Sequence, residues 1–226
     1  MTVTATFAIV SGLVLGVCLW LLDRRLAPCF ASIAGCAAEC APSGWGVALY
    51  LAVSVPLATF LLATRYQASA YLLYLVVVGA TLLWIASIDW RWRIIPNRVV
   101  YPASLAALLL SPVAKPGPPV QALLNTLIGF VVSGGIFLLF YLLGVLLYRR
   151  ADAFGLGDVK LAGFVGIAVG YPGAVAATLL ATVAGAVLAL GWGLAYRSPK
   201  VGFPYGPAIV VGALATMLIT PISNPT

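Results

Sequence analysis

The chain has 226 residues, of which 63% are hydrophobic and only 8% are charged. A soluble domain carries about one quarter charged residues, so this composition excludes an ordinary soluble protein and indicates an integral membrane protein. The net charge of +7 does not indicate nucleic-acid binding, because the basic residues fall between apolar segments rather than along one face. The lack of histidine excludes catalytic triads built on His and metal sites ligated by His.

The apolar segments, taken in chain order, predict about eight helices. They cover about residues 4–22, 45–63, 69–88, 99–112, 119–147, 159–171, 173–196 and 206–222. The fifth is long enough to tilt or protrude, whereas the fourth and sixth are short and predict partial or re-entrant elements. We therefore expect an all-α polytopic membrane protein with a single membrane domain over residues 1–226. Residues 1–44 would form the first helix and a short cytoplasmic loop, and residues 45–226 the core.

The basic residues predict the orientation of these segments. With eight spans and the N-terminus outside, ten of the twelve basic residues fall in inner loops: Arg24, Arg25, Arg91, Arg93, Arg98, Arg149, Arg150, Lys160, Arg197 and Lys200. The outer loops hold Arg65 and Lys115. Because cytoplasmic loops are enriched in Lys and Arg, this orientation is the one we expect.

Small residues recur in the later segments. They include Gly163, Gly166, Gly170, Gly185, Gly191 and Gly193. Small side chains let the backbones of membrane helices approach one another, so these glycines predict close helix packing.

Two of the few acidic residues are candidates for a functional site. The chain contains only Asp23, Glu39, Asp89, Asp152 and Asp158. A carboxylate beside hydrocarbon is costly, and by default it indicates function. In the orientation that the basic residues alone predict, Asp89 and Asp158 both fall at the cytoplasmic ends of apolar segments.

Each of these two aspartates also has a structural interpretation. Asp158 follows Gly155-Leu156-Gly157 and starts a helix, where it could serve only as an N-terminal cap. Asp89 closes the third helix, where the helix dipole disfavours an anion. For Asp89 the alternative is a salt bridge to Arg91 or Arg93.

Three sequence blocks resemble those of a known family. They are Ile88-Asp89 with Ile95-Pro96-Asn97, then Gly155-Leu156-Gly157-Asp158-Val159-Lys160-Leu161, and finally Gly202-Phe203-Pro204-Tyr205-Gly206-Pro207. In this order they are similar to the signature blocks of type IV prepilin leader peptidases, which belong to the GxGD class of intramembrane aspartic proteases. The resemblance covers about residues 45–222.

The resemblance implies an endopeptidase of a bacterial-type inner membrane. It would remove the short basic leader of prepilin- or pseudopilin-like substrates at the cytoplasmic face, with Asp89 and Asp158 as the catalytic pair and no cofactor. Two nearby carboxyls do not both ionise easily, so one would activate water while the other donates to the scissile carbonyl. Which aspartate plays which role stays open.

The residues implied to support them are Gly155, Gly157, Lys160, Pro96, Asn97, Pro204, Gly206 and Pro207. Lys160 would orient the pair or lower its pKa, or be an ordinary interfacial lysine.

The chain departs from the bifunctional members of that family. Those members carry a cytoplasmic insert with paired CxxC motifs that bind zinc, and the insert methylates the new N-terminus. Here the corresponding loop, about residues 23–44, holds only Cys29, Cys36 and Cys40, and Cys18 lies in the first helix. Because zinc sites need compact sets of about four ligands, and about 20 residues are too few for a separate domain, we expect neither a metal site nor methyltransferase activity.

Two other functions are compatible with the sequence. The short loop leaves open a non-enzymatic subunit that keeps the fold inside a larger membrane assembly, which would copurify with partners and cleave nothing. Intramembrane acids also serve as proton relays, so a small transporter or channel is the third hypothesis, and it predicts proton-dependent flux in liposomes.

Overall fold

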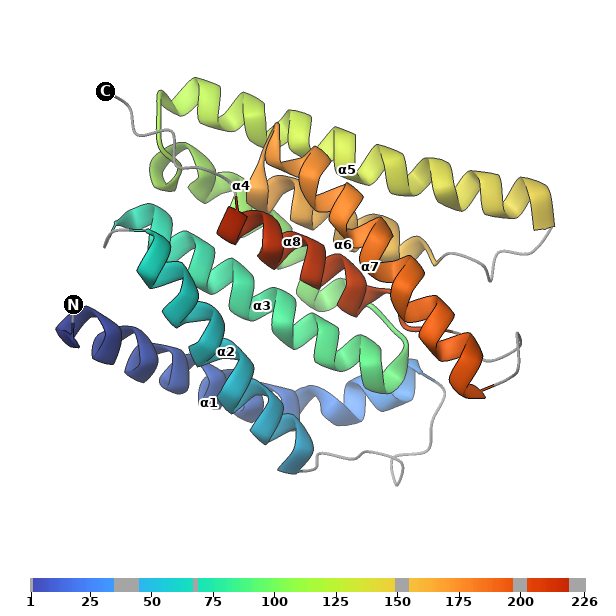
Figure 1. Ribbon diagram of the computed structural model, residues 1–226, viewed down its shortest axis with the longest axis horizontal. Coiled ribbons are helices and arrows are strands. Elements are labelled where there is room, and N and C mark those ends of the chain that lie inside the picture. The colour runs from blue at the N-terminus through green and yellow to red at the C-terminus, as the bar shows by residue number, and fades with distance from the viewer. Residues whose placement is uncertain (1, 35–44, 67–68, 149–154, 197–202, 220–226) are drawn as a thin grey trace.

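The computed structural model describes residues 2–34, 45–66, 69–148, 155–196 and 203–219, and within these ranges it contains eight α-helices and no strand. The helices are α1 (Thr2–Ile33), α2 (Trp45–Arg65), α3 (Ala70–Trp92), α4 (Asn97–Ala114), α5 (Pro119–Tyr148), α6 (Leu156–Val169), α7 (Gly173–Tyr196) and α8 (Gly206–Ile219). They alternate in direction, so the ends of α1, α3, α5 and α7 and the starts of α2, α4, α6 and α8 lie toward one end of the bundle (Figure 1). The all-α fold expected from the sequence is confirmed.

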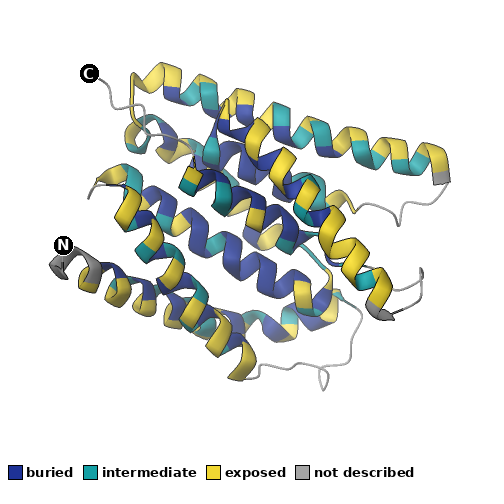
Figure 2. Cartoon of the chain, in the orientation of Figure 1, coloured by how far each residue is buried: buried dark blue, intermediate teal, exposed yellow. Residues whose placement is uncertain are grey.

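Five of the described helices, α1, α2, α3, α5 and α7, are long and apolar enough to cross a membrane. Helices α6 and α8 have only 14 residues each, which is about 21 Å of helix against about 30 Å of hydrocarbon. The short α6 is surrounded by protein, since residues 161–168 are all buried. Figure 2 shows the same for much of α3, whereas α1 and α5 expose long stretches to the surroundings.

The first helix is longer than the sequence predicts. The expected helix over residues 4–22 and loop over 23–44 are wrong at their shared boundary, because α1 continues to Ile33. The charged group that was expected to end the helix is instead neutralised inside the fold, where Asp23 forms a 2.7 Å ion pair with Arg91 of α3. A partner that is distant in sequence therefore overrides the local charge signal.

Helix α6 is held close to α5 by glycines. A Cβ atom added to Gly166 would lie 2.6 Å from the carbonyl carbon of Gly129, so the two backbones touch. The predicted close packing is thus confirmed at Gly166 and also at Gly163. At Gly191 and Gly193 of α7, in contrast, an added Cβ would meet nothing within 4 Å. Gly163 and Gly166 therefore fix the position of α6 against α5, and α6 carries Asp158.

Several residues that the sequence singles out lie outside the described ranges. They are Cys36, Glu39, Cys40, Arg149, Arg150, Asp152, Arg197, Lys200 and Gly202. The external N-terminus and the side that each end of the bundle faces stay predictions.

Candidate functional site

Asp89 lies in the last turn of α3, and only 4% of its surface is exposed. Because α3 continues to Trp92, the helix does not end at Ile88 as predicted. The carboxylate Oδ2 accepts a 2.8 Å hydrogen bond from the backbone N–H of Gly206, the first residue of α8. A helix N-terminus carries partial positive charge, so α8 supplies the stabilisation that the C-terminal end of α3 cannot.

In the first turn of α8, the N–H of Gly206 is the donor that is available to Asp89. The first N–H groups of a helix have no partner within it, and Pro207 has none to satisfy. The next two N–H groups both bond to the carbonyl of Tyr205, which leaves the N–H of Gly206 for Asp89. A Cβ atom on Gly206 would lie 2.6 Å from Oδ2 of Asp89, so only glycine permits this contact.

Asp158 occupies the first turn of α6, which is not among the spanning helices. Its Oδ2 accepts a 3.2 Å hydrogen bond from the N–H of Gly155, and its own N–H donates to the carbonyl of Gly155 at 3.0 Å. The predicted position of Asp158 as the N-cap is wrong, because Gly155 is the N-cap and Asp158 is the third residue of the helix, although its side chain does accept the N–H of Gly155. Burial raises the pKa of Asp158 to about 7, and the negative charge of Asp89 raises it as well, while the bond from Gly155 opposes both. The charge of Asp89 thus acts on Asp158, while the assignment of the two carboxyls to one catalytic site stays a prediction.

The turn between α3 and α4 meets the first turn of α6. Arg93 ends α3 in the left-handed conformation, with φ of 53°, and Pro96 precedes the first turn of α4. Between them, the side chain of Ile95 packs directly on Gly157, where an added Cβ would lie 3.1 Å from the Cβ of Ile95. The first two sequence blocks, which are far apart along the chain, are therefore in contact.

Lys160 connects α6 to α4 rather than to the aspartates. Its ammonium donates to Oδ1 of Asn97 at 3.1 Å and lies 5.6 Å from the ring centre of Tyr101. Both partners belong to α4. Within the described ranges no hydrogen bond or ion pair joins this lysine to Asp89 or Asp158. Its predicted roles, to orient the pair, to lower its pKa or to be an ordinary interfacial lysine, stay predictions.

No ion pair neutralises Asp89 or Asp158 within the described ranges. The predicted alternative of a salt bridge from Asp89 to Arg91 is wrong, because Arg91 pairs with Asp23 at 2.7 Å. Arg93 also forms no ion pair with Asp89 there. The interpretation of Asp89 as half of a structural ion pair is therefore excluded for these partners.

Tyr205 lies beside the aspartates, although its sequence block alone assigns it no role. It directly precedes Gly206, whose N–H donates to Asp89. Burial raises the pKa of its hydroxyl, a hydrogen bond to Thr182 lowers it, and the charge of Asp158 raises it. Pro204 beside it is buried and Pro207 is half-buried. The aromatic position in the Pro-aromatic-Gly-Pro block was the signal that could have identified Tyr205.

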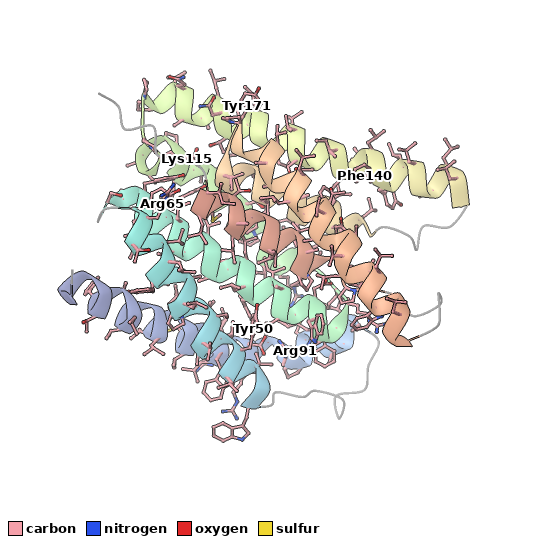
Figure 3. All side chains as sticks on the ribbon, viewed as in Figure 1. Tyr50, Arg65, Arg91, Lys115, Phe140 and Tyr171 are labelled. Atoms are coloured by element: carbon pink, nitrogen blue, oxygen red, sulfur yellow. The ribbon has the colours of Figure 1, made fainter. Side chains whose placement is uncertain are left out.

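A groove of about 610 Å³ lies on another side of the end of α3. It is lined by Gly46, Val47, Tyr50, Ala86, Ser87, Trp90, Arg91 and Pro207. Figure 3 shows Tyr50 and Arg91 near each other at this end of the bundle. Neither Asp89 nor Asp158 lines the groove, so it is separate from the aspartate pair.

No metal-binding cluster is present in the part of the chain that the structure describes. There, no three side chains of His, Cys, Asp or Glu come together. Cys29 instead accepts a 3.1 Å hydrogen bond from Arg98. Because Cys36 and Cys40 lie outside the described ranges, the expected lack of a zinc site stays a prediction.

Comparison with known proteins identifies the family. The family model described as Type IV leader peptidase family matches residues 76–190, just over half of the chain. This span contains Asp89 and Asp158. The chain therefore belongs to the type IV leader peptidase family, as its sequence blocks predicted, and family membership implies a peptidase. Searches of curated proteins and of solved structures gave no match.

Proposed function

We propose that this protein is a membrane aspartic endopeptidase with Asp89 and Asp158 as its catalytic pair. Its substrates would be prepilin- or pseudopilin-like proteins, cut after their leader at the cytoplasmic face of a bacterial-type inner membrane. The observation that supports this most directly is that the two aspartates, neither of them ion-paired within the described ranges, each accept a hydrogen bond from a backbone N–H, that of Gly206 for Asp89 and that of Gly155 for Asp158. Family membership supplies the class of reaction.

The two aspartates would share the work of activating water. Asp89 is the better candidate for the ionised partner, because the N–H of Gly206 donates to it at 2.8 Å, a shorter bond than the 3.2 Å bond from Gly155 to Asp158. Asp158, whose pKa is raised to about 7, is about half protonated at neutral pH and can supply the proton. In this scheme Asp89 takes a proton from water as the oxygen attacks the scissile carbonyl, and Asp158 donates to the carbonyl oxygen. Collapse of the tetrahedral intermediate then returns a proton to the leaving amine.

The cytoplasmic location rests on the distribution of basic residues. Arg93, Arg98 and Lys160 lie beside the two aspartates in the sequence blocks that form the site. Loops enriched in Lys and Arg stay on the cytoplasmic side of membranes. A leader that is basic and soluble would reach the site from that side, while the following apolar helix stays in the bilayer.

The test is cleavage by the purified protein in detergent, with Asp158→Asn as the matched variant. The substrate is a membrane protein with a short basic leader before an apolar helix, and mass spectrometry measures the N-terminus of the product. With the wild type we expect a product that has lost a leader-sized mass. With Asp158→Asn we expect a cleavage rate at least about 10³-fold lower, because removing one of two catalytic groups that act as a unit removes most of the catalysis.

Two outcomes would contradict the proposal. If the folded wild-type protein leaves such substrates uncut, the non-enzymatic subunit becomes the better hypothesis. If Asp158→Asn cleaves at the wild-type rate, the assigned pair is wrong. The same experiment with an added methyl donor tests the second activity, and we expect the new N-terminus to stay unmethylated.

A further inference from the structure

We propose that Tyr205 and Gly185 are positioning residues for Asp89, acting through the backbone N–H of Gly206. This inference rests on the proposed function only in its kinetic readout. It assigns a role in the aspartate site to α7, a helix that carries neither of the two aspartates.

The ring of Tyr205 is lodged against the backbone of α7. A Cβ atom added to Gly185 would overlap the Cε2 and Cζ atoms of this ring. The hydroxyl of Tyr205 lies 3.4 Å from the carbonyl oxygen of Ala181, one helical turn earlier. Helix α7 also packs along α8, the helix that begins just after Tyr205 (Figure 1). The ring of Tyr205 therefore packs in the space that the missing side chain of Gly185 leaves on α7.

Aromatic rings on its other sides prevent the ring from moving freely. Phe137 of α5 lies 5.9 Å from it between ring centres, and Phe203 lies 6.1 Å away. Phe137 is itself only 1% exposed, so it has little room to give way. Because the ring is confined on these sides, a displacement at Gly185 passes to the backbone of Tyr205.

The backbone of Tyr205 sets the first turn of α8. Its carbonyl accepts the N–H groups of Ala208 and Ile209, and the next residue is Gly206, whose N–H donates to Asp89 at 2.8 Å. A shift of Tyr205 therefore changes the one hydrogen bond found on the Asp89 carboxylate within the described ranges. Three helices therefore determine the position of the Gly206 N–H. They are α7 through Gly185, α5 through Phe137, and α8 through its first turn.

The test compares Gly185→Ala with Gly191→Ala, a matched control in the same helix where an added Cβ meets nothing within 4 Å. We expect Gly185→Ala to lower kcat about tenfold or more with KM within about twofold, because a misplaced catalytic base affects the chemical step rather than ground-state binding. Gly191→Ala should match the wild type. In combination, Gly185→Ala with Tyr205→Ala should be no slower than Tyr205→Ala alone, since the ring that clashes is then gone.

A second readout does not depend on cleavage. The chain has only four aspartates, Asp23, Asp89, Asp152 and Asp158, so ¹³Cγ-aspartate NMR gives few signals, which Asp→Asn variants assign. We expect the Asp89 signal to move in Gly185→Ala and to stay in place in Gly191→Ala, with the Asp23 signal unchanged in both. If the wild type cleaves no substrate, the proposed function fails, and these spectra still decide the positioning role.

If Gly185→Ala does not fold, Tyr205→Ala and Tyr205→Phe carry the test without adding any atom to α7. Tyr205→Phe keeps the ring, and we expect it to recover at least half of the kcat that Tyr205→Ala loses, with the Asp89 signal near its wild-type position. The inference is overturned if Gly185→Ala behaves like Gly191→Ala in rate and spectrum. It is also overturned if Tyr205→Ala leaves the Asp89 signal unmoved.

Discussion

Asp23 and Asp89 are both buried carboxylates, with 1% and 4% of their surfaces exposed, yet the fold holds them in opposite ways. Asp23 has a 2.7 Å ion pair with Arg91 and a 3.0 Å hydrogen bond from the indole of Trp84. Asp89, two residues before Arg91, has no ion pair in the described ranges and one backbone donor. The carboxylate of Asp23 is therefore in contact with a cation, whereas the hydrogen bond found on the carboxylate of Asp89 comes from a neutral backbone group.

A third charge, on the half-buried Lys115, extends the comparison to the opposite end of the bundle. Figure 3 shows Lys115 far from Arg91. Its ammonium donates to the carbonyl of Ile167 at 2.7 Å, in the last turn of α6, and to the hydroxyl of Thr126 at 2.8 Å. Like Asp89, it is held by neutral groups at a helix end rather than by an opposite charge, and burial lowers its pKa to about 7.

The largest effect on stability is expected from breaking the compensated pair. Asp23→Asn leaves the guanidinium of Arg91 buried, with 12% of its side chain exposed and no counter-ion. Removing one partner of a buried ion pair costs about 3–5 kcal/mol. Unfolding in detergent should show this loss, while the cleavage rate per folded molecule stays within about twofold of wild type. A protein of unchanged stability would contradict the structural role given to Asp23.

Displacing Asp89 from its backbone donor should lower the rate rather than the stability. In Gly206→Ala the added Cβ would lie 2.6 Å from Oδ2, so the carboxylate must leave its hydrogen bond. We expect kcat to fall about 10- to 100-fold, which is about 1.4–2.7 kcal/mol in the barrier, with a smaller change in stability. Gly135→Ala in α5, where an added Cβ meets nothing within 4 Å, is the control. Equal rates for the two variants would disprove the role of this donor.

Lys115 should make stability depend on pH. Its pKa is about 7 in the folded protein and about 10.4 in an unfolded chain, so between these values the unfolded chain binds more protons. Stability due to this group therefore rises with pH from about 7 to about 10, by up to about 1.4 kcal/mol per pH unit. The difference in unfolding free energy between wild type and Lys115→Met, measured at pH 7 and pH 9, should show this slope. A constant difference would mean that Lys115 titrates normally.

The smallest effect is expected when both charges of the compensated pair are removed together. Replacing a buried ion pair with apolar residues of similar size is often neutral or stabilising. Asp23→Leu combined with Arg91→Met should therefore change the unfolding free energy by only about 1 kcal/mol, far less than Asp23→Asn alone. If the double variant loses as much as the single one, the pair contributes packing rather than charge compensation.

Apolar segment lengths predicted the eight helices, and the scarcity of acids directed attention to Asp89 and Asp158. Local sequence patterns do not predict which aspartate forms an ion pair, because Arg91 lies 68 residues from Asp23 in sequence. The charge run at Asp23 was therefore taken for a helix end. The donor on Asp89 lies 117 residues away and could not be assigned either. Likewise, the six small residues of the later segments look alike in sequence, yet Gly185 holds a ring and Gly191 meets nothing.

The most direct test of the account compares Asp89→Asn with Asp23→Asn, with cleavage rate and unfolding free energy measured on the same preparations. Asparagine keeps an oxygen for the Gly206 donor but cannot accept a proton from water. We predict that Asp89→Asn loses about 10³-fold or more in rate while keeping its stability, and that Asp23→Asn loses stability while keeping its rate. A variant Asp89→Asn that still cleaves, or one that loses activity only because it unfolds, would contradict the assignment of Asp89, which has no ion pair in the described ranges, as a catalytic residue.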